Sequence, residues 1–222
     1  MFKRTKGILI AVGTLFLFCA SPARAAMVGG VAAPLKYGEA SISLALGYSE
    51  RDIKDGGEDA AASRRFLFKG AFGFGGGASV YAFAGLSDLD YRTTGGEHFK
   101  GKLAESVGAG LRYTPLGFSE DSRLVLDFQG DYLSSDDGDA TVRATQFAFT
   151  TYVVGKFGTF YPYGGVSLSA AAYDGEGEDF KSSRNVGILL GTEYFVNPNV
   201  FLTLELRLFD ENAAYLCAGY MF

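Results

Sequence analysis

Hydrophobic and polar residues alternate along most of the chain after residue 37, in short segments that repeat about ten times. In residues 123–132, Leu124 and Phe128 occupy one side of such a segment, and Asp127, Gln129 and Asp131 occupy the other. A period of two places successive side chains on opposite faces of a β-strand. The pattern predicts ten strands, at residues 40–49, 65–74, 78–87, 102–113, 123–132, 141–154, 161–172, 185–195, 200–209 and 213–222.

The connections between these segments alternate in length and chemistry. The short or compact ones are residues 75–77, 115–121, 155–159 and 196–199. The others are mostly longer and rich in Asp, Glu and Gly, at residues 50–64, 88–100, 134–140 and 174–183. Short turns at one rim and long polar loops at the other are typical of transmembrane β-barrels.

The two faces of the strands differ in the sense that a barrel in a membrane requires. One face is continuously apolar, and the other carries small and charged residues. A soluble β-sandwich also alternates, but its strands would not carry isolated acids beside glycines in mid-strand. Because an open sheet edge in lipid leaves backbone groups unpaired, the sheet must close. We predict an all-β fold: a closed antiparallel up-and-down transmembrane β-barrel of ten strands, with eight or twelve as alternatives.

The polar face is expected to form the interior of the barrel. Gly108 and Gly110 should leave space beside Asp127, and the small residues Cys217 and Gly219 should do the same opposite Glu205. With bases and acids nearly balanced, pairing across a narrow lumen is expected. The side chains that parity points inward are Lys69, Arg112, Asp127, Gln129, Asp131, Glu193, Glu205 and Arg207.

This lumen network predicts a measurable effect if the barrel conducts ions. Replacement of Arg207 by alanine would loosen the network, raise the conductance and favour cations.

Aromatic residues near the rim of the short turns are expected to form an interfacial girdle. They are Phe72, Phe74, Tyr113, Phe160, Tyr161, Tyr194, Phe195, Tyr220 and Phe222.

The last ten residues form an alternating segment that ends on an aromatic residue. Leu216, Ala218, Tyr220 and Phe222 share one face. This pattern resembles the closing strand of the small bacterial outer-membrane β-barrel family. The chain resembles that family over nearly all of its mature length. The resemblance implies a Gram-negative source, an outer-membrane location, and recognition of these four residues by the barrel-assembly machinery.

The first residues predict export. Lys3, Arg4 and Lys6 precede an apolar run at residues 7–20, and a small-residue cleavage site ends at Ala25. Residues 1–25 are therefore expected to be a signal peptide and residues 26–222 the barrel. Without residues 1–25 the chain keeps 16 basic and 25 acidic residues, a net charge of −9, which disfavours nucleic acid as a partner. One cysteine remains, so no intramolecular disulfide is expected.

No motif predicts catalysis, a cofactor or a metal. The single histidine, His98, lies in the same loop as Asp88 and Asp90. Outer-membrane omptin proteases also have ten strands and use paired acids with a His–Asp pair, but no Asp-x-His sequence occurs here, and a solvated His98 is expected. The acidic runs at residues 136–139 and 174–179 lack the spacing of an EF-hand and are expected to be solvated loop charge.

These observations favour an integral outer-membrane protein without enzymatic activity, acting as a narrow channel or a closed structural barrel. Two alternatives remain: a surface adhesion or binding protein acting through the acidic loops, and an outer-membrane enzyme. The expected partners are outer-membrane lipid, lipopolysaccharide and the barrel-assembly machinery.

Overall fold

The computed structural model describes residues 35–54, 60–92, 98–119, 121–175, 179–182 and 185–222. Within these ranges the chain forms thirteen strands. No helix in this part of the chain is long and apolar enough to cross a membrane. The predicted signal peptide, residues 1–25, lies outside the described residues.

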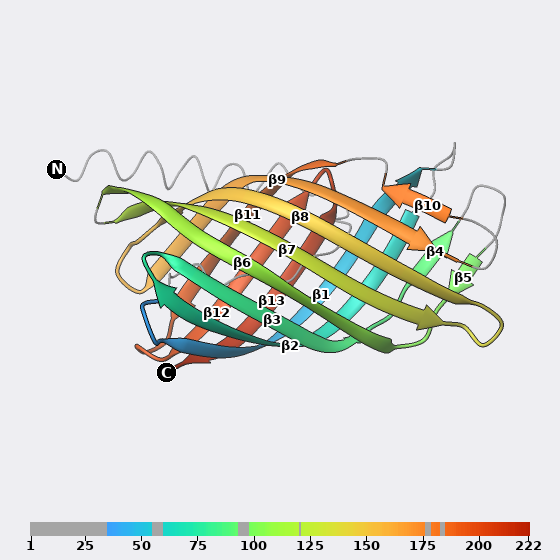
Figure 1. The fold of residues 1–222 in the computed structure, drawn as a ribbon, viewed down its shortest axis with the longest axis horizontal. Coiled ribbons are helices and arrows are strands. Elements are labelled where there is room, and N and C mark those ends of the chain that lie inside the picture. Colours follow the sequence, from blue (N-terminus) through green and yellow to red (C-terminus); the bar gives the residue numbers. More distant parts are fainter. Residues whose placement is uncertain (1–34, 55–59, 93–97, 120, 176–178, 183–184) are drawn as a thin grey trace.

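Long antiparallel strands form the wall of a closed barrel (Figure 1). Each pairs with its neighbour in the sequence, and β1 closes the sheet by pairing with both β2 and β13. The prediction of a closed antiparallel barrel of ten strands is confirmed for the described residues. The wall strands are β1 (Ala40–Lys54), β2 (Ala60–Gly75), β3 (Ala78–Ser87), β6 (Ala104–Ser119), β7 (Ser122–Asp136), β8 (Thr141–Gly155), β9 (Phe160–Asp174), β11 (Val186–Phe195), β12 (Val200–Leu208) and β13 (Asn212–Met221).

Several wall strands extend beyond their predicted ends at the long-loop end of the barrel. β1 and β2 pair as far as Asp52 and Ala60, so much of the predicted loop at residues 50–64 is strand. Three short strands continue the sheet there: β4 (Asp90–Arg92), β5 (His98–Lys100) and β10 (Asp179–Ser182). β4 pairs with β2, β5 pairs with β4, and β10 pairs with both β9 and β1. We call this end the outer end, and the end with the short turns the inner end.

The predicted compact turn at residues 115–121 is wrong in its bounds. β6 continues through Pro115 to Ser119, and the pairing with β7 shifts register between Tyr113 and Leu116. A proline has no N–H to donate, so it fits a strand at an irregularity of this kind, where the ladder is already interrupted. The β6–β7 hairpin therefore continues beyond the predicted start of the turn.

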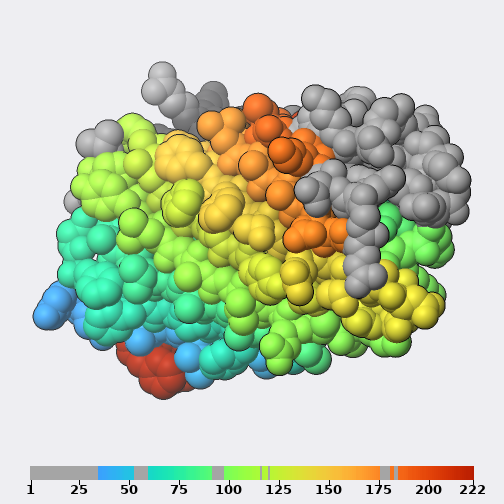
Figure 2. Space-filling view, turned by 45° about the vertical axis from the view of Figure 1, so that its right-hand side comes forward, coloured from blue at the N-terminus to red at the C-terminus, as the bar shows by residue number. Residues whose placement is uncertain are grey.

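Side chains alternate between the interior and the outer wall. On β12, Leu202 and Leu204 are exposed, whereas Phe201, Thr203 and Glu205 are buried. The same alternation on neighbouring strands gives an apolar outer surface. In the space-filling view of Figure 2, the strands of this wall run side by side as oblique bands of colour.

Arginine at Leu204 is expected to lower the free energy of unfolding by about 2–4 kcal/mol, the cost of a cation on the lipid face near the bilayer midplane. Thr145→Arg is the matched control, because Thr145 is exposed on β8 nearer the outer end. It is expected to cost no more than about 1 kcal/mol, as at an interface. Urea unfolding in lipid vesicles measures both, and equal costs would contradict the assignment of the lipid face.

Candidate functional site: the barrel interior

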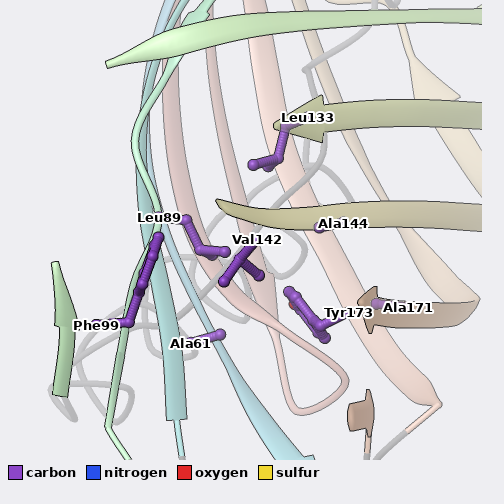
Figure 3. Packing of buried hydrophobic residues seen from close by; sticks show 8 residues of the cluster. All are labelled: Ala61, Leu89, Phe99, Leu133, Val142, Ala144, Ala171 and Tyr173. Atoms are coloured by element: carbon purple, nitrogen blue, oxygen red, sulfur yellow. The ribbon is translucent and has the colours of Figure 1, made fainter. Parts of the chain in front are cut away.

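Apolar side chains fill the outer end of the interior. We call this group the outer cap: Ala61, Leu89, Phe99, Leu133, Val142, Ala144, Ala171 and Tyr173. Leu89 and Phe99 come from the connection between β3 and β6, are only 2 % and 4 % exposed, and pack against inward side chains of the wall (Figure 3). The Phe99 ring also stacks on Tyr91, with 5.3 Å between centroids. The predicted polar loop at residues 88–100 thus contributes two residues to the cap.

Buried ion pairs lie next along the interior. Arg51 Nη2 is 2.5 Å from Glu211 Oε2, and Arg51 Nη1 donates to Ser169 Oγ at 3.0 Å. The turn between β12 and β13 carries Glu211, and in that turn Phe209 has a φ of 83°. A positive φ is strained for a residue with a side chain, so the surrounding contacts must hold this turn in place.

The same turn also brings Asp210 into the interior. Its Oδ2 accepts hydrogen bonds from Ser167 at 2.9 Å and from Ser169 at 2.7 Å. A separate pair joins Arg65 Nη1 to Asp131 Oδ2 at 2.9 Å, with neither side chain exposed. Buried charges of this kind are costly unless paired, so these contacts link strands that are not neighbours in the wall.

The middle of the interior contains most of the predicted network. Arg112 Nη2 is 2.7 Å from Asp127 Oδ2, and Arg207 Nε is 2.8 Å from Glu205 Oε1. The Tyr81 hydroxyl donates to Asp127 at 2.5 Å. We call these paired groups, together with the Arg51 and Arg65 pairs, the charged middle.

The structure places the remaining predicted residues around this network. Lys69 Nζ lies 3.8 Å from the centroid of the Tyr81 ring, a cation–π contact. Glu193 is buried nearer the inner end and accepts from Thr203 Oγ1 at 3.2 Å. Asp131 pairs with Arg65, which has the same parity as Lys69 on β2 but was not counted in the predicted network.

Aromatic rings occupy the space that was predicted to stay open beside the glycines. A Cβ built on Gly110 would lie 2.2 Å from the Tyr81 ring, and one built on Gly108 would lie 2.2 Å from the Phe83 ring. Gly110 and Tyr81 are direct cross-strand partners, and so are Gly108 and Phe83. The prediction of free space is therefore wrong, because each ring lies against the glycine opposite it.

The closing strand also differs from the prediction. Cys217 stands opposite Thr203, and Tyr215 stands opposite Glu205. Rings cover glycines here in the same way: Phe201 covers Gly219, and Tyr215 covers Gly47. These rings remove the space that was expected beside Glu205.

The inner end is closed by a second apolar group, the inner plug: Tyr161, Phe195, Phe201 and Met221. The Phe195 ring centroid is 5.4 Å from that of Tyr161 and 5.9 Å from that of Phe201. Phe195 is only 8 % exposed. The prediction that Tyr161 and Phe195 belong to the interfacial girdle is therefore wrong, because their parity turns both rings inward.

The other predicted girdle residues do lie on the outer surface. Phe74 and Tyr194 are about half exposed, and Phe72 and Phe74 meet edge to face at 5.3 Å. Exposed aromatic rings at one level of a barrel wall are typical of a membrane interface. The exposed members are Phe72, Phe74, Tyr113, Phe160, Tyr194, Tyr220 and Phe222.

The charged middle contains a very small space. A space of about 10 Å³ lies between Arg112, Asp127, Glu205 and Arg207. A cavity of roughly 10–15 Å³ on this measure holds about one water molecule. Among the described residues, side chains thus occupy the interior at three successive levels.

Of the loop residues considered for catalysis or metal binding, His98 and Asp137 make local contacts, and residues 176–178 lie outside the described residues. His98 Nε2 lies 2.8 Å from Asp90 Oδ1 across the β4–β5 hairpin. Asp137 Oδ1 accepts from the backbone N–H groups of Asp139 and Ala140, and these bonds lower the pKa of Asp137. No group of three or more His, Cys, Asp or Glu residues suited to a metal ion occurs among the described residues.

The closed antiparallel sheet, its apolar outer wall and its charged interior define a transmembrane β-barrel. Neither a protein-family model nor a curated protein sequence matches the chain.

The chain resembles solved structures of bacterial outer-membrane proteins. One is Ail, the attachment invasion locus protein of Yersinia pestis, with 16 % identity, 84 % of this chain and 99 % of that chain covered, and a TM-score of 0.40. An outer membrane channel from Pseudomonas putida F1 has 10 % identity, coverage of 89 % and 100 %, and a TM-score of 0.47. OprG from Pseudomonas aeruginosa has 12 % identity, coverage of 84 % and 97 %, and a TM-score of 0.39. Likeness at this level identifies no function. A function must therefore be argued from the residues of this chain.

The glycine–ring contacts predict a position-specific effect on stability. Gly110→Ala is expected to lower the free energy of unfolding by about 1–3 kcal/mol, because the new Cβ must displace the Tyr81 ring in a filled interior. Gly70→Ala is the matched control, since a Cβ at Gly70 meets nothing within 4 Å. It is expected to be neutral or to stabilise by a few tenths of a kcal/mol. Unfolding in detergent by urea measures both, and similar losses for the two variants would refute the ring contact.

Proposed function

We propose that this protein is an integral outer-membrane β-barrel without enzymatic activity whose interior is closed to ions. The observation that carries this proposal is the filling of the interior at the outer cap, the charged middle and the inner plug. A conducting lumen needs a continuous water path, and the space of about 10 Å³ in the charged middle holds about one water molecule. Of the channel and the closed barrel, the geometry therefore favours the closed barrel.

The chemistry of the charged middle also favours a structural role. Arg65 and Asp131 are fully buried, and removing one member of such a pair costs roughly 3–5 kcal/mol. Groups held this tightly link β2 to β7 across the interior. The network thus stabilises the wall by linking its strands, rather than lining a path for a permeating ion.

We further propose that residues 1–25 direct export and that the last strand directs assembly. The four residues of the assembly signal, Leu216, Ala218, Tyr220 and Phe222, all face outward on or beside β13. The Tyr220 and Phe222 rings meet at 4.9 Å, and the Phe222 N–H donates to Ala40 O at 2.8 Å. This placement at the closing seam supports recognition of the strand by the barrel-assembly machinery before β1 pairs with it.

Outer-membrane lipid surrounds the exposed wall in this proposal, and lipopolysaccharide is the proposed outer-leaflet partner. The apolar outer surface supports the lipid contact. The inner end, with the C-terminus, then faces the periplasm, and the outer cap faces outward.

Planar-bilayer recording tests the closed interior. Wild-type protein and Arg207→Ala are both expected to show no channel events, because Arg207→Ala leaves the outer cap and the inner plug in place. This replaces the expectation from sequence that Arg207→Ala raises conductance. Heat-modifiable mobility of the reconstituted sample confirms that folded protein is present. Stepwise currents from wild-type protein would refute the closed barrel, and currents from Arg207→Ala alone would show that only the charged middle closes it.

Deletion of Phe222 tests the assembly signal. The folded population in the outer membrane is expected to fall, while export to the periplasm is unchanged, because the aromatic end of the signal stripe is lost. Phe222→Tyr is the control, since it keeps an aromatic ring at the same position. Fractionation and heat-modifiable mobility measure both steps. A deletion variant that folds at the wild-type level would remove the support for a C-terminal signal.

A further inference from the structure

A pocket of about 410 Å³ opens at the inner mouth of the barrel, beneath the inner plug. Tyr161 and Phe195 line its apolar side. Ligand pockets typically measure roughly 300–1,000 Å³ and combine an apolar lining with a few polar groups. Since Phe195 also packs on Phe201, the pocket ends blindly at the plug. It is therefore suited to retain a ligand rather than to pass one.

Basic residues from separate segments converge on this pocket. Lys36 precedes β1, Arg123 lies at the start of β7, and Lys156 follows the end of β8. Of the described residues that line the pocket, only Glu39 is acidic, and its Oε1 is 3.0 Å from Lys36 Nζ. The lining thus carries a local excess of positive charge in a chain whose net charge is −5.

Local contacts fix two parts of this charge pattern. The backbone N–H of Lys36 donates to Glu39 Oε2 at 2.8 Å, and this bond lowers the pKa of Glu39. Glu39 therefore stays ionised and paired with Lys36. The backbone N–H of Lys156 donates to the carbonyl of Asp121, which ties the β8–β9 turn to the β6–β7 turn. Lys156 is accordingly held beside the start of β7, where Arg123 lies, at the same mouth.

We propose that the inner mouth binds a small organic carboxylate with an apolar or aromatic body. In this arrangement Arg123 and Lys156 bind the carboxylate, and the rings of Tyr161 and Phe195 contact the body. Charge-assisted hydrogen bonds from arginine and lysine suit a carboxylate. The pocket rings face inward, as shown by their place in the inner plug, so the ligand comes from the aqueous side and not from the lipid around the wall. This site goes beyond the proposed closed barrel, since binding at the mouth needs no path through it.

Two probes of nearly the same shape, one charged and one neutral, test the proposal. N-acetylphenylalanine carries a carboxylate and an aromatic ring, and N-acetylphenylalaninamide replaces the carboxylate with a neutral amide. Isothermal titration of the folded protein in detergent is expected to show the amide binding at least about tenfold more weakly, the loss of one charge-assisted hydrogen bond. Inorganic phosphate, which lacks an apolar body, is expected to compete poorly. Equal affinities for the two probes, displacement by phosphate as effective as by N-acetylphenylalanine, or no saturable binding of N-acetylphenylalanine, would overturn the proposal.

Matched variants locate the site. Arg123→Gln combined with Lys156→Gln is expected to weaken binding of N-acetylphenylalanine at least about tenfold. Arg143→Gln combined with Lys181→Gln removes the same charge near the outer end, where both side chains are exposed, and is expected to leave affinity unchanged. Heat-modifiable mobility shows that each variant is folded. Equal weakening by both pairs would mean a general charge effect and would also overturn the site.

Discussion

The pairing of β1 with β13 is the contact on which the rest of the structure depends. It runs from Ser41 opposite Met221 to Glu50 opposite Asn212, and it joins the first strand of the wall to the last. In a membrane, each unpaired backbone group costs several kcal/mol, so the sheet is viable only when this seam is complete. Because the seam also fixes the register of both strands, it decides which side chains face lipid and which face inward.

Once the sheet is closed, side chains must occupy its interior. Two kinds of contact do this. Charges from distant strands meet as pairs, as Arg65 and Asp131 do, which offsets the cost of burying them. Rings such as Tyr81 and Tyr215 lie over glycines of the adjacent strand and take up the volume that those residues leave. The strands that form the wall therefore also supply side chains that occupy the interior.

The fold was largely predictable from the sequence, because a period of two directly reports the two faces of a strand. The segment 78–87 even has the bounds of β3. The depth of each inward side chain in the barrel, and the residue with which it pairs, were harder to predict from the sequence. Phe99 lies in a loop that reads as polar, and only the three-dimensional fold of the β4–β5 hairpin brings it into the barrel. Phe195 has inward parity, but it was assigned to the interfacial girdle because it is aromatic and lies near a rim. Glu211 gave no signal, since a turn has no parity.

The glycine–ring pairs have an evolutionary consequence. In most protein interiors two facing side chains occupy a shared volume. Replacing one of them by a smaller residue therefore leaves the other in place. Here Tyr81 alone fills the space above Gly110, and Phe83 alone fills the space above Gly108. Loss of either ring would leave nothing on the facing strand to take its place. Single aromatic codons therefore determine how much of this level of the interior is occupied.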